Sequence, residues 1–382
     1  MELKEDPIDI RNIGWTLGNE CPFRCSHCYS MSARQKGMDM TRGYIDRIVS
    51  ELAKNRVETV NLGGNEPLFT NGLNPRSTLL PYILERVIDA GIIVGLTSAG
   101  VTVNYMAEHH QDSFRLLNDI DVSLDSPFPE EHNTNRGAPL FNVALRALRY
   151  CQDARIEHTI IMCGMNWNLT PAHLRRLVEL AKETGSNVRI NFLKPTEMKH
   201  FVSMPSVEQF YRASELLLEE CVPIELGEPL LRTAVSSNGR GCPCGTKSFR
   251  IHSITPEGKV PVSPCVYLHD YRVGDLLTGD LYDIVRSPQF REFRRRRANP
   301  QAIGDCAGCN YSDSCRGGCA ARAFLAGGNP PSLWVKDPYC LADFEKAGKV
   351  FAPERYNGGD CHEQDKTLVH RDYLCTLILV PK

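Results

Sequence analysis

The sequence lacks both a long apolar run and a strong excess of charge of one sign. No apolar stretch approaches the ~18 residues that a membrane-spanning helix requires, and the start, MELKEDPIDIRNIGWTL, has no basic segment followed by an apolar one, which argues against a secretion signal. A formal net charge of −2 gives no electrostatic reason to expect nucleic acid as a partner. The one basic run, at residues 294–297, is interpreted as the solvated end of a helix stopped by Asn299 and Pro300, rather than as a binding patch. These absences predict a cytoplasmic protein with neither a membrane nor nucleic acid as partner.

The sequence has no internal repeat and no low-complexity tract, but it is rich in cysteine. Its 382 residues are 42% hydrophobic and 24% charged, which is ordinary for a globular protein, and 16 of them are cysteines. Because cytosolic thiols are kept reduced, so many cysteines indicate metal ligation rather than disulfides. Cys21, Cys25 and Cys28 stand alone in the first 150 residues, whereas ten cysteines fall between Cys242 and Cys375. We therefore expect a metal-binding N-terminal unit and a cysteine-dense C-terminal unit.

Short apolar runs alternate with amphipathic stretches from Ile13 to about Gln209. Six strands are expected, at residues 13–17, 59–64, 92–98, 119–125, 157–163 and 188–194. Helices are expected between them, at residues 41–55, 79–91, 141–154 and 170–185. This alternation is typical of βαβ units and a parallel sheet, and six repeats predict an α/β fold with a partial (β/α)6 barrel similar to a TIM barrel. In such barrels the reactive groups lie at the C-terminal ends of the strands.

The composition changes near Gly227 to loops rich in glycine, proline and cysteine, after a helical connector at residues 206–222. In GRGCPCGTKSFRIHSITPEGKVPVSPC, two strands joined by a Pro-Glu-Gly turn would form a hairpin that brings Cys265 back towards Cys242 and Cys244. A helix is expected at residues 273–298. These features predict a small cysteine-rich α+β module after the barrel. The expected boundaries are 1–12 for an N-terminal extension, 13–226 for the barrel, 227–345 for the module and 346–382 for a C-terminal tail.

The first cysteines lie in the loop ECPFRCSHCYS, directly after the first expected strand. Three cysteines are one fewer than the four ligands of a closed zinc site or of a closed iron–sulfur cluster. Their spacing lets one loop place thiolates at three corners of a cubic 4Fe–4S cluster and leave the fourth iron open for a substrate or cofactor. The alternative is a zinc site that is completed by His27 or by a distant residue.

This loop resembles the signature of the radical S-adenosylmethionine superfamily, Cx3Cx2C after the first barrel strand, which Cys21, Cys25 and Cys28 match. In that family the open iron of a 4Fe–4S cluster binds the amino and carboxylate groups of S-adenosylmethionine. An electron from the cluster then breaks a carbon–sulfur bond and gives the 5′-deoxyadenosyl radical, which abstracts a hydrogen atom from the substrate. The resemblance implies the same cofactors and the same chemistry here.

Further motifs along the barrel extend the resemblance. GGNEP resembles the GGEP loop that holds the methionyl ammonium, with Glu66 as the best match and Asn65 as an alternative. VSLDSP resembles a strand end that contacts the ribose, and Arg136 resembles a basic residue that pairs with the methionyl carboxylate. Each motif alone also fits a structural role, such as a turn, a helix cap or a surface ion pair, but their order favours the cofactor. The resemblance implies cofactor contacts at His27, Tyr29, Gly63, Gly64, Asn65, Glu66, Ser123, Asp125, Arg136, Asn168 and Leu193.

The C-terminal cysteines resemble the SPASM module of the same superfamily, which implies two auxiliary 4Fe–4S clusters. The first would be held by Cys242 and/or Cys244 together with Cys265 and Cys319. The second would be held by Cys306, Cys309, Cys315 and Cys340. The sequence departs from the module's pattern, since six residues rather than four separate Gly258 from Cys265. Cys242 and Cys244 are also only one residue apart, so either both bind the first cluster or one binds and an iron stays open.

The remaining cysteines have less specific interpretations. Cys163, near the end of an expected strand, is a candidate hydrogen-atom donor to a substrate radical, and its alternative is a small buried apolar residue. Cys151 and Cys221 are interpreted as buried. Cys361 and Cys375 are either free thiols or additional ligands.

The resemblance implies an enzyme, and the auxiliary clusters favour oxidation, crosslinking or epimerisation of a peptide. Since only 12 residues precede Ile13, no N-terminal leader-binding domain is expected, and a separate peptide-recognition protein is a candidate partner. An external one-electron donor such as flavodoxin or ferredoxin is also implied. The alternatives are oxidation or epimerisation of a small molecule such as a sugar or aminocyclitol, and, from another class, a non-catalytic iron–sulfur or zinc scaffold.

Overall fold

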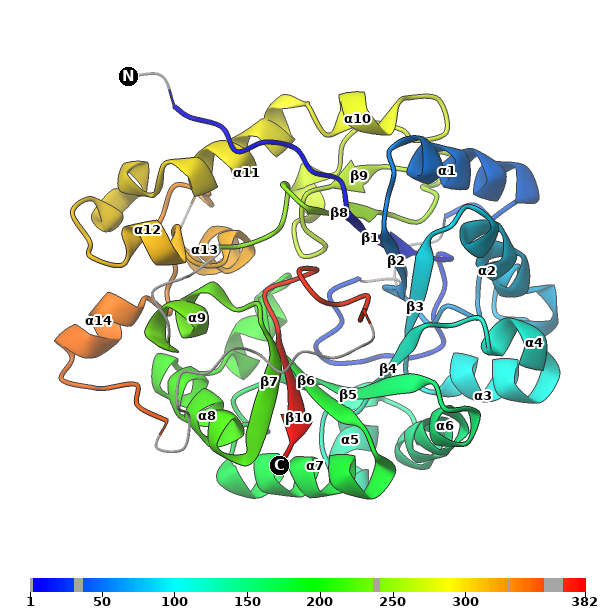
Figure 1. Cartoon of the computed structure of the whole chain (residues 1–382), viewed down its shortest axis with the longest axis horizontal. Coiled ribbons are helices and arrows are strands. Elements are labelled where there is room, and N and C mark those ends of the chain that lie inside the picture. The colour runs from blue at the N-terminus through cyan, green and yellow to red at the C-terminus, as the bar shows by residue number, and fades with distance from the viewer. Residues whose placement is uncertain (1–2, 31–36, 236–240, 329, 354–366) are drawn as a thin grey trace.

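One ten-stranded sheet curves through the computed structural model of the chain, in the order β7-β10-β6-β5-β4-β3-β2-β1-β8-β9 (Figure 1). The structure describes residues 3–30, 37–235, 241–328, 330–353 and 367–382. Strands β1 to β6 run parallel, and helices cover the outside of this part of the sheet. The predicted α/β partial barrel followed by a cysteine-rich module is therefore confirmed.

The six predicted strands and the predicted helices at α1, α2, α6, α7 and α8 lie close to their expected ranges, whereas β7, α3, α4 and α5 were not predicted. The strands are β1 (Asn12–Thr16), β2 (Thr59–Gly63), β3 (Ile93–Ser98), β4 (Asp119–Ser123), β5 (Glu157–Gly164), β6 (Asn187–Phe192) and β7 (Cys221–Leu226). The helices are α1 (Arg42–Lys54), α2 (Leu80–Asp89), α3 (Val101–His109), α4 (Gln111–Phe114), α5 (Pro129–Arg136), α6 (Phe141–Ala154), α7 (Pro171–Thr184) and α8 (Val207–Glu220). Among the described residues, no helix is long and apolar enough to cross a bilayer.

Local sequence signals set the ends of the outer helices. At α7, the Thr170 side chain accepts a hydrogen bond from the backbone of His173, Pro171 occupies the first turn, and Gly185 ends the helix at a φ of 64°. At α8, Ser206 and Gln209 form a reciprocal capping box. These residues explain why the sequence pattern placed both helices correctly.

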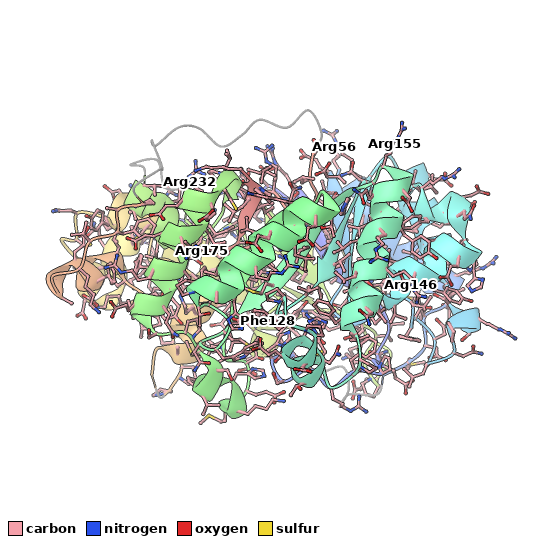
Figure 2. The ribbon with its side chains drawn as sticks, turned by 90° about the horizontal axis from the view of Figure 1, so that it is seen from below. Arg56, Phe128, Arg146, Arg155, Arg175 and Arg232 are labelled. Atoms are coloured by element: carbon pink, nitrogen blue, oxygen red, sulfur yellow. The ribbon has the colours of Figure 1, made fainter. Side chains whose placement is uncertain are left out.

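The two rims of the barrel carry different residues. In Figure 2, Arg56 and Arg155, which precede β2 and β5, lie along the upper rim, whereas Phe128, which follows β4, lies towards the opposite rim. Because the strands are parallel, their C-terminal ends all meet at the rim of Phe128. The loops at that rim carry the predicted site residues.

Strands from outside the predicted repeats extend the sheet at both ends. The predicted hairpin forms as β8 (Ser248–Ile251) and β9 (Val262–Ser263), and β8 also pairs in parallel with β1. The last strand, β10 (Leu377–Pro381), lies antiparallel between β6 and β7 (Figure 1). The end of the expected C-terminal tail therefore contributes a strand to the barrel sheet.

The cysteine-rich module is built from short helices: α9 (Pro229–Val235), α10 (Leu281–Ile284), α11 (Pro288–Ala298), α12 (Ser312–Cys315), α13 (Ala320–Ala326) and α14 (Leu341–Lys346). The single helix predicted at residues 273–298 is wrong. The chain makes turns before α10, and Pro288 then starts a new helix because proline is accommodated in a first turn but not in a helix interior. The predicted stop at Asn299 and Pro300 is confirmed, since α11 ends at Ala298.

The basic run at the end of α11 is only partly solvated, contrary to the sequence-based expectation. Arg294 is buried and pairs with Glu5 at 2.6 Å. Arg296 is buried as well, and donates hydrogen bonds to the backbone carbonyls of Leu333 and Gly317. Alternate arginines therefore hold the module together, which also removes the basis for a basic binding patch.

A buried ionic cluster joins α13 to the barrel side of the module. Arg322, which is fully buried, pairs with Glu228 at 2.9 Å and with Asp337 at 2.7 Å. Both carboxylates are buried as well, and Asp337 also accepts a hydrogen bond from the backbone of Cys319 at 2.8 Å. The position of Cys319 is thus coupled to this ionic cluster.

Candidate functional site

The predicted three-cysteine loop lies at the C-terminal rim of the barrel, directly after β1. Cys21, Cys25 and Cys28 all line one cleft there. The loop is held against the end of α5, since the backbone N–H of Ser26 donates to the carbonyl of Asn135 at 2.9 Å. The structure therefore brings together the three thiols that the sequence singled out.

Burial favours the protonated form of two of these thiols when no metal is bound. Burial raises the pKa of Cys21 to about 12, and burial also raises the pKa of Cys25, which lies 3.9 Å from Nη1 of Arg136. Thiols in this state ionise when a metal displaces the proton. No group of three or more His, Cys, Asp or Glu side chains among the described residues surrounds the position of a single metal ion. A four-iron cubane does not require such a position, because each thiolate binds a different iron.

A buried carboxylate at the end of β4 organises the wall beside the cysteine loop. Asp125 accepts hydrogen bonds from Arg136 Nε at 2.6 Å, from Asn135 Nδ2 at 2.9 Å and from the backbone of Cys163 at 3.1 Å. Burial alone would raise the pKa of the Asp125 carboxyl, but the neighbouring Arg136 guanidinium holds the pKa well below its usual value. The carboxylate is therefore ionised and keeps the guanidinium beside the cysteines.

His27 enters this network as a neutral ring. Burial lowers the pKa of His27 to about 4. Its Nδ1 lies 3.0 Å from the side-chain nitrogen of Asn135, and because that amide nitrogen only donates, the proton of the ring is on Nε2, 3.6 Å from Asp125. The uncharged ring of His27 lines the cleft. It is therefore available for the predicted contact with the cofactor.

The buried carboxylate of Glu66 is held in place by the ends of two neighbouring elements. Its carboxylate accepts four hydrogen bonds, from the hydroxyls of Ser98 and Thr102 at 2.5 Å each and from the backbone of Ala99 and Thr102 at 2.8 and 2.7 Å. These donors lie at the end of β3 and the start of α3. Glu66 therefore joins the β2 loop to the β3 loop while it lines the cleft.

The glycines and asparagine before Glu66 shape the same loop. Gly64 has a φ of 86°, and a Cβ there would lie 2.4 Å from Oγ1 of Thr16, so only glycine fits. Asn65 accepts a hydrogen bond from Ser30 at 3.0 Å, which connects this loop to the cysteine loop. Gly63 is the last residue of β2 and is not among the residues that line the cleft, whereas Gly64 and Asn65 are.

The other predicted residues divide into lining and supporting groups. Tyr29, Ser123, Cys163 and Leu193 line the cleft. Asn168 does not line it: its side chain is fully buried and donates to the carbonyls of Asp125 at 2.7 Å and Cys163 at 2.9 Å. The structure thus places Asn168 behind the wall, where it fixes the ends of β4 and β5.

Sequence reasoning missed a polar wall on the far side of the cleft, which encloses about 1130 Å³ including its open mouth. Arg189 forms a buried ion pair with Asp121, and His370 lies 3.3 Å from the same carboxylate. The Oδ1 atom of Asn191 has no hydrogen-bond partner among the described residues. A charged residue inside an apolar strand, such as Arg189 in NVRINF, was the available signal. The missed lining residues include Asn61, Thr97, Arg189, Asn191, Lys194, Arg250, His370 and Tyr373.

The first predicted auxiliary group gathers in one buried cluster and includes one more thiol. Cys242, Cys244, Cys265 and Cys319 pack together with Cys375, which the sequence left open as a free thiol or a ligand. The thiol of Cys242 makes hydrogen-bonding contacts with Cys244 and Cys375. Cys244 in turn contacts Cys265, and Cys375 contacts Cys319. Five thiols therefore share the place predicted for four.

The second predicted auxiliary group also converges. Burial, with smaller contributions from the nearby thiols of Cys306, Cys340 and Cys309, raises the pKa of Cys315 to about 11. The backbone of Cys309 donates to the carbonyl of Cys306 at 3.1 Å, which makes a tight turn between the two. Cys361 lies outside the described residues.

Comparison with known families agrees with this geometry. A model of the radical SAM superfamily matches residues 15–181, and a model of the SPASM iron–sulfur cluster-binding domain matches residues 229–310. The first range contains the cysteine loop, Asp125, Arg136 and Cys163, which meet in the cleft. This chain belongs to the radical S-adenosylmethionine superfamily. Its cofactors are S-adenosylmethionine and iron–sulfur clusters, and it is an enzyme of the radical SAM class.

This radical SAM enzyme has similar relatives along most of its length. The mycofactocin maturase MftC of Mycobacterium ulcerans is 27% identical to it over 363 residues, which are 90% of each chain. Among solved structures, anSMEcpe with bound AdoMet has a TM-score of 0.64 at 16% identity, covering 88% of this chain and 97% of that one. Streptococcus suis SuiB bound to S-adenosylmethionine has a TM-score of 0.65 at 15% identity, covering 87% of this chain and 78% of that one. The two solved structures confirm the fold of the radical SAM enzyme.

Proposed function

We propose that this enzyme reductively cleaves S-adenosylmethionine in the cleft and uses the resulting radical to modify a peptide. The observation that carries the proposal is the convergence of Cys21, Cys25 and Cys28 with the buried pair of Asp125 and Arg136. When bound, a 4Fe–4S cluster and S-adenosylmethionine supply the 5′-deoxyadenosyl radical, which removes a hydrogen atom from the substrate. The protein supplies orientation and exclusion of water.

Arg136 is the residue to which we assign the methionyl carboxylate. Asp125 accepts a hydrogen bond from Arg136 Nε at 2.6 Å, and Arg136 Nη1 lies 3.9 Å from the Cys25 sulfur, so the guanidinium is fixed at the wall of the cleft beside the cysteine loop. Asp125 accordingly orients Arg136 in addition to its proposed contact with the ribose, which it shares with Ser123. A charged hydrogen bond from the Arg136 guanidinium to the methionyl carboxylate is strong in a buried site of low dielectric. It would therefore favour binding of the whole methionyl group.

The other cofactor contacts follow from which atoms face the cleft. Glu66 lines the cleft and its Oε2 atom accepts one hydrogen bond, from the backbone of Ala99, so we assign the methionyl ammonium to this carboxylate and its loop, in which Gly64 and Asn65 also line the cleft. The proposed adenine and ribose contacts are His27, Tyr29 and Leu193. Gly63 and Asn168 are proposed as supporting residues behind these contacts.

The number of clusters is also a proposal: one in the barrel and two in the module. The sets are the cysteine loop, the buried group around Cys265 and Cys319, and the group around Cys306 and Cys315. The proposed division of the chain remains 13–226 for the barrel and 227–345 for the module. Residues 1–12 precede the barrel, and the tail at 346–382 returns to its sheet as β10.

Three considerations support a peptide as the substrate. The relatives at 26–27% identity are mycofactocin maturases. The structural neighbour SuiB is known bound to its precursor peptide SuiA. The cleft is open and is lined by residues of the barrel, the module and the C-terminal segment, which is the form of site that an extended chain can enter. A separate peptide-recognition protein and an external electron donor such as flavodoxin or ferredoxin are proposed partners.

The test is turnover by the anaerobically reconstituted, dithionite-reduced enzyme. We expect formation of 5′-deoxyadenosine and a change in mass of a short precursor peptide encoded beside the gene, measured by liquid chromatography and mass spectrometry. Conversion of a sugar or aminocyclitol but not of the peptide would support the small-molecule alternative. Failure to form 5′-deoxyadenosine with any of these substrates would support a non-catalytic scaffold.

Cys163 is proposed to donate a hydrogen atom to the substrate radical. Its thiol lines the cleft, and burial raises its pKa, so it carries the S–H bond at neutral pH. Transfer gives a product C–H bond and a thiyl radical, which an electron from the external donor and a proton from water restore. We expect Cys163→Ala to keep forming 5′-deoxyadenosine but to lose at least ~10-fold in incorporation of deuterium from D2O into the peptide.

The matched control is Cys151→Ala, which removes a thiol buried within α6 and outside the cleft. It is expected to retain both 5′-deoxyadenosine formation and deuterium incorporation. Undiminished incorporation in Cys163→Ala would show that another group donates the hydrogen atom.

A further inference from the structure

A fifth thiol completes the first auxiliary group from the far end of the chain. Cys375 precedes β10, is only 4% exposed, and contacts both Cys242 and Cys319. The contacts form a chain that runs from Cys265 through Cys244, Cys242 and Cys375 to Cys319. Cys375 is therefore the link between the cysteine pair of the hairpin and the cysteine that starts α13.

The backbone on both sides of Cys375 is fixed by other parts of the fold. The carbonyl of Tyr373 accepts hydrogen bonds from Ser248 Oγ and from Arg250 Nη2, each at 2.7 Å. The carbonyl of Thr376 accepts from the backbone of Gly227 at 2.8 Å. The thiol is thus held in place before any metal binds, because the chain is anchored at Tyr373 before it and at Thr376 after it.

A glycine allows this close approach. A Cβ on Gly227 would lie 2.8 Å from the carbonyl oxygen of Leu374 and 3.1 Å from that of Thr376, so a larger residue would push the segment away from the cysteines. Gly227 begins the stretch where the composition changes to the cysteine-rich module. The junction between barrel and module is therefore shaped to receive the segment that carries Cys375.

The surroundings suit a negatively charged cluster. The Lys194 side chain is buried, and its ammonium nitrogen lies 5.0 Å from the centroid of the Tyr267 ring, which packs in the same cluster as these cysteines. The backbone N–H of Ala320 points at the Cys242 sulfur. A buried cation and a backbone donor lower the cost of placing thiolates in an apolar pocket.

We propose that Cys375 is a ligand of the first auxiliary cluster. This inference rests on the proposed presence of that cluster. The ligand set is then Cys265, Cys319, Cys375 and one member of the Cys242 and Cys244 pair, which removes the need for two residues only one position apart to reach two corners of the same cubane. The cluster has no open iron, so its role is electron transfer rather than binding of the substrate.

The test counts iron in a protein whose catalytic cluster has been removed. The parent carries Cys21→Ala, Cys25→Ala and Cys28→Ala, and after anaerobic reconstitution it is expected to hold about eight irons per chain in two clusters. Addition of Cys375→Ala is expected to remove about four of them, or to change the electron paramagnetic resonance spectrum of the reduced protein where a three-ligand cluster persists. The matched control is Cys221→Ala, a buried cysteine at the other end of the β7–β10 pair, which is expected to keep both iron and spectrum.

Comparison with the cysteine pair gives a second readout. Of Cys242→Ala and Cys244→Ala, each added singly to the parent, one is expected to be tolerated. Loss of the cluster in both, with iron and spectrum unchanged in Cys375→Ala, would overturn the proposal and identify Cys375 as a spare thiol. A parent that holds about four irons or fewer would refute the second auxiliary cluster itself, and with it this inference. Circular dichroism of each variant separates cluster loss from unfolding.

Discussion

Replacement of Cys25 by alanine is expected to abolish cleavage of S-adenosylmethionine by the reduced enzyme. Two thiolates would remain where three leave a single iron open, so the cluster is not retained in the form that binds the cofactor. Cys25 also lies 3.9 Å from Arg136, the proposed partner of the methionyl carboxylate. Because residues that merely support metal ligands cost roughly 10–100-fold when removed, loss of a ligand is expected to exceed ~100-fold in 5′-deoxyadenosine formation. The same result is expected for Cys21→Ala and Cys28→Ala.

Iron analysis shows whether this loss is local. Cys25→Ala is expected to retain about eight of about twelve irons, since the auxiliary groups lie in the separate cysteine-rich module. Cys151→Ala is the control, because burial alone raises the pKa of that thiol to about 12 and it takes part in no cysteine group. Full cleavage activity in any of the three loop variants would overturn the assignment of the catalytic cluster.

Much of the barrel could be predicted because its signals are local. Each of β1 to β6 is a short apolar run followed by an amphipathic helix, and caps such as Thr170 and Gly185 mark the helix ends. The strand-end rule then brings Cys25, Glu66, Asp125 and most other predicted contacts to one cleft without any knowledge of their distances.

The missed features depend on partners that are distant in the sequence. The residues LILVP of β10 form a short apolar run at the end of the chain, and their partners lie in β6 and β7. Tyr373 and His370 reach the cleft because β10 inserts between those strands. Arg296 is buried because carbonyls of Leu333 and Gly317 accept its hydrogen bonds, which no charge pattern within α11 reveals.

A second large effect is expected at the junction between barrel and module. Arg322 is fully buried between Glu228 and Asp337, with its guanidinium 4.6 Å from the ring centroid of Tyr339. Removal of the arginine leaves two carboxylates in the interior without a counter-charge. Such a loss costs about 3–5 kcal/mol in measured cases, because the uncompensated charges cannot regain their hydration.

Arg322→Met, which keeps an unbranched side chain but removes the guanidinium, is therefore expected to destabilise the protein by about 3–5 kcal/mol, measured as a fall in the urea midpoint of tryptophan fluorescence. Arg176→Met is the matched control: Arg176 pairs with Glu183 at 2.7 Å, but both side chains are exposed, so its loss is expected to cost no more than ~1 kcal/mol. Addition of Glu228→Gln and Asp337→Asn to Arg322→Met is expected to recover part of the stability, since neutral amides need no counter-charge. Recovery would distinguish the effect of the unpaired charges from the effect of lost packing. An Arg322→Met midpoint equal to that of Arg176→Met would show that the ionic cluster contributes nothing to stability.

Because Asp337 also accepts a hydrogen bond from the backbone of Cys319, Arg322→Met is further expected to loosen the first auxiliary cluster and leave the catalytic cleft intact.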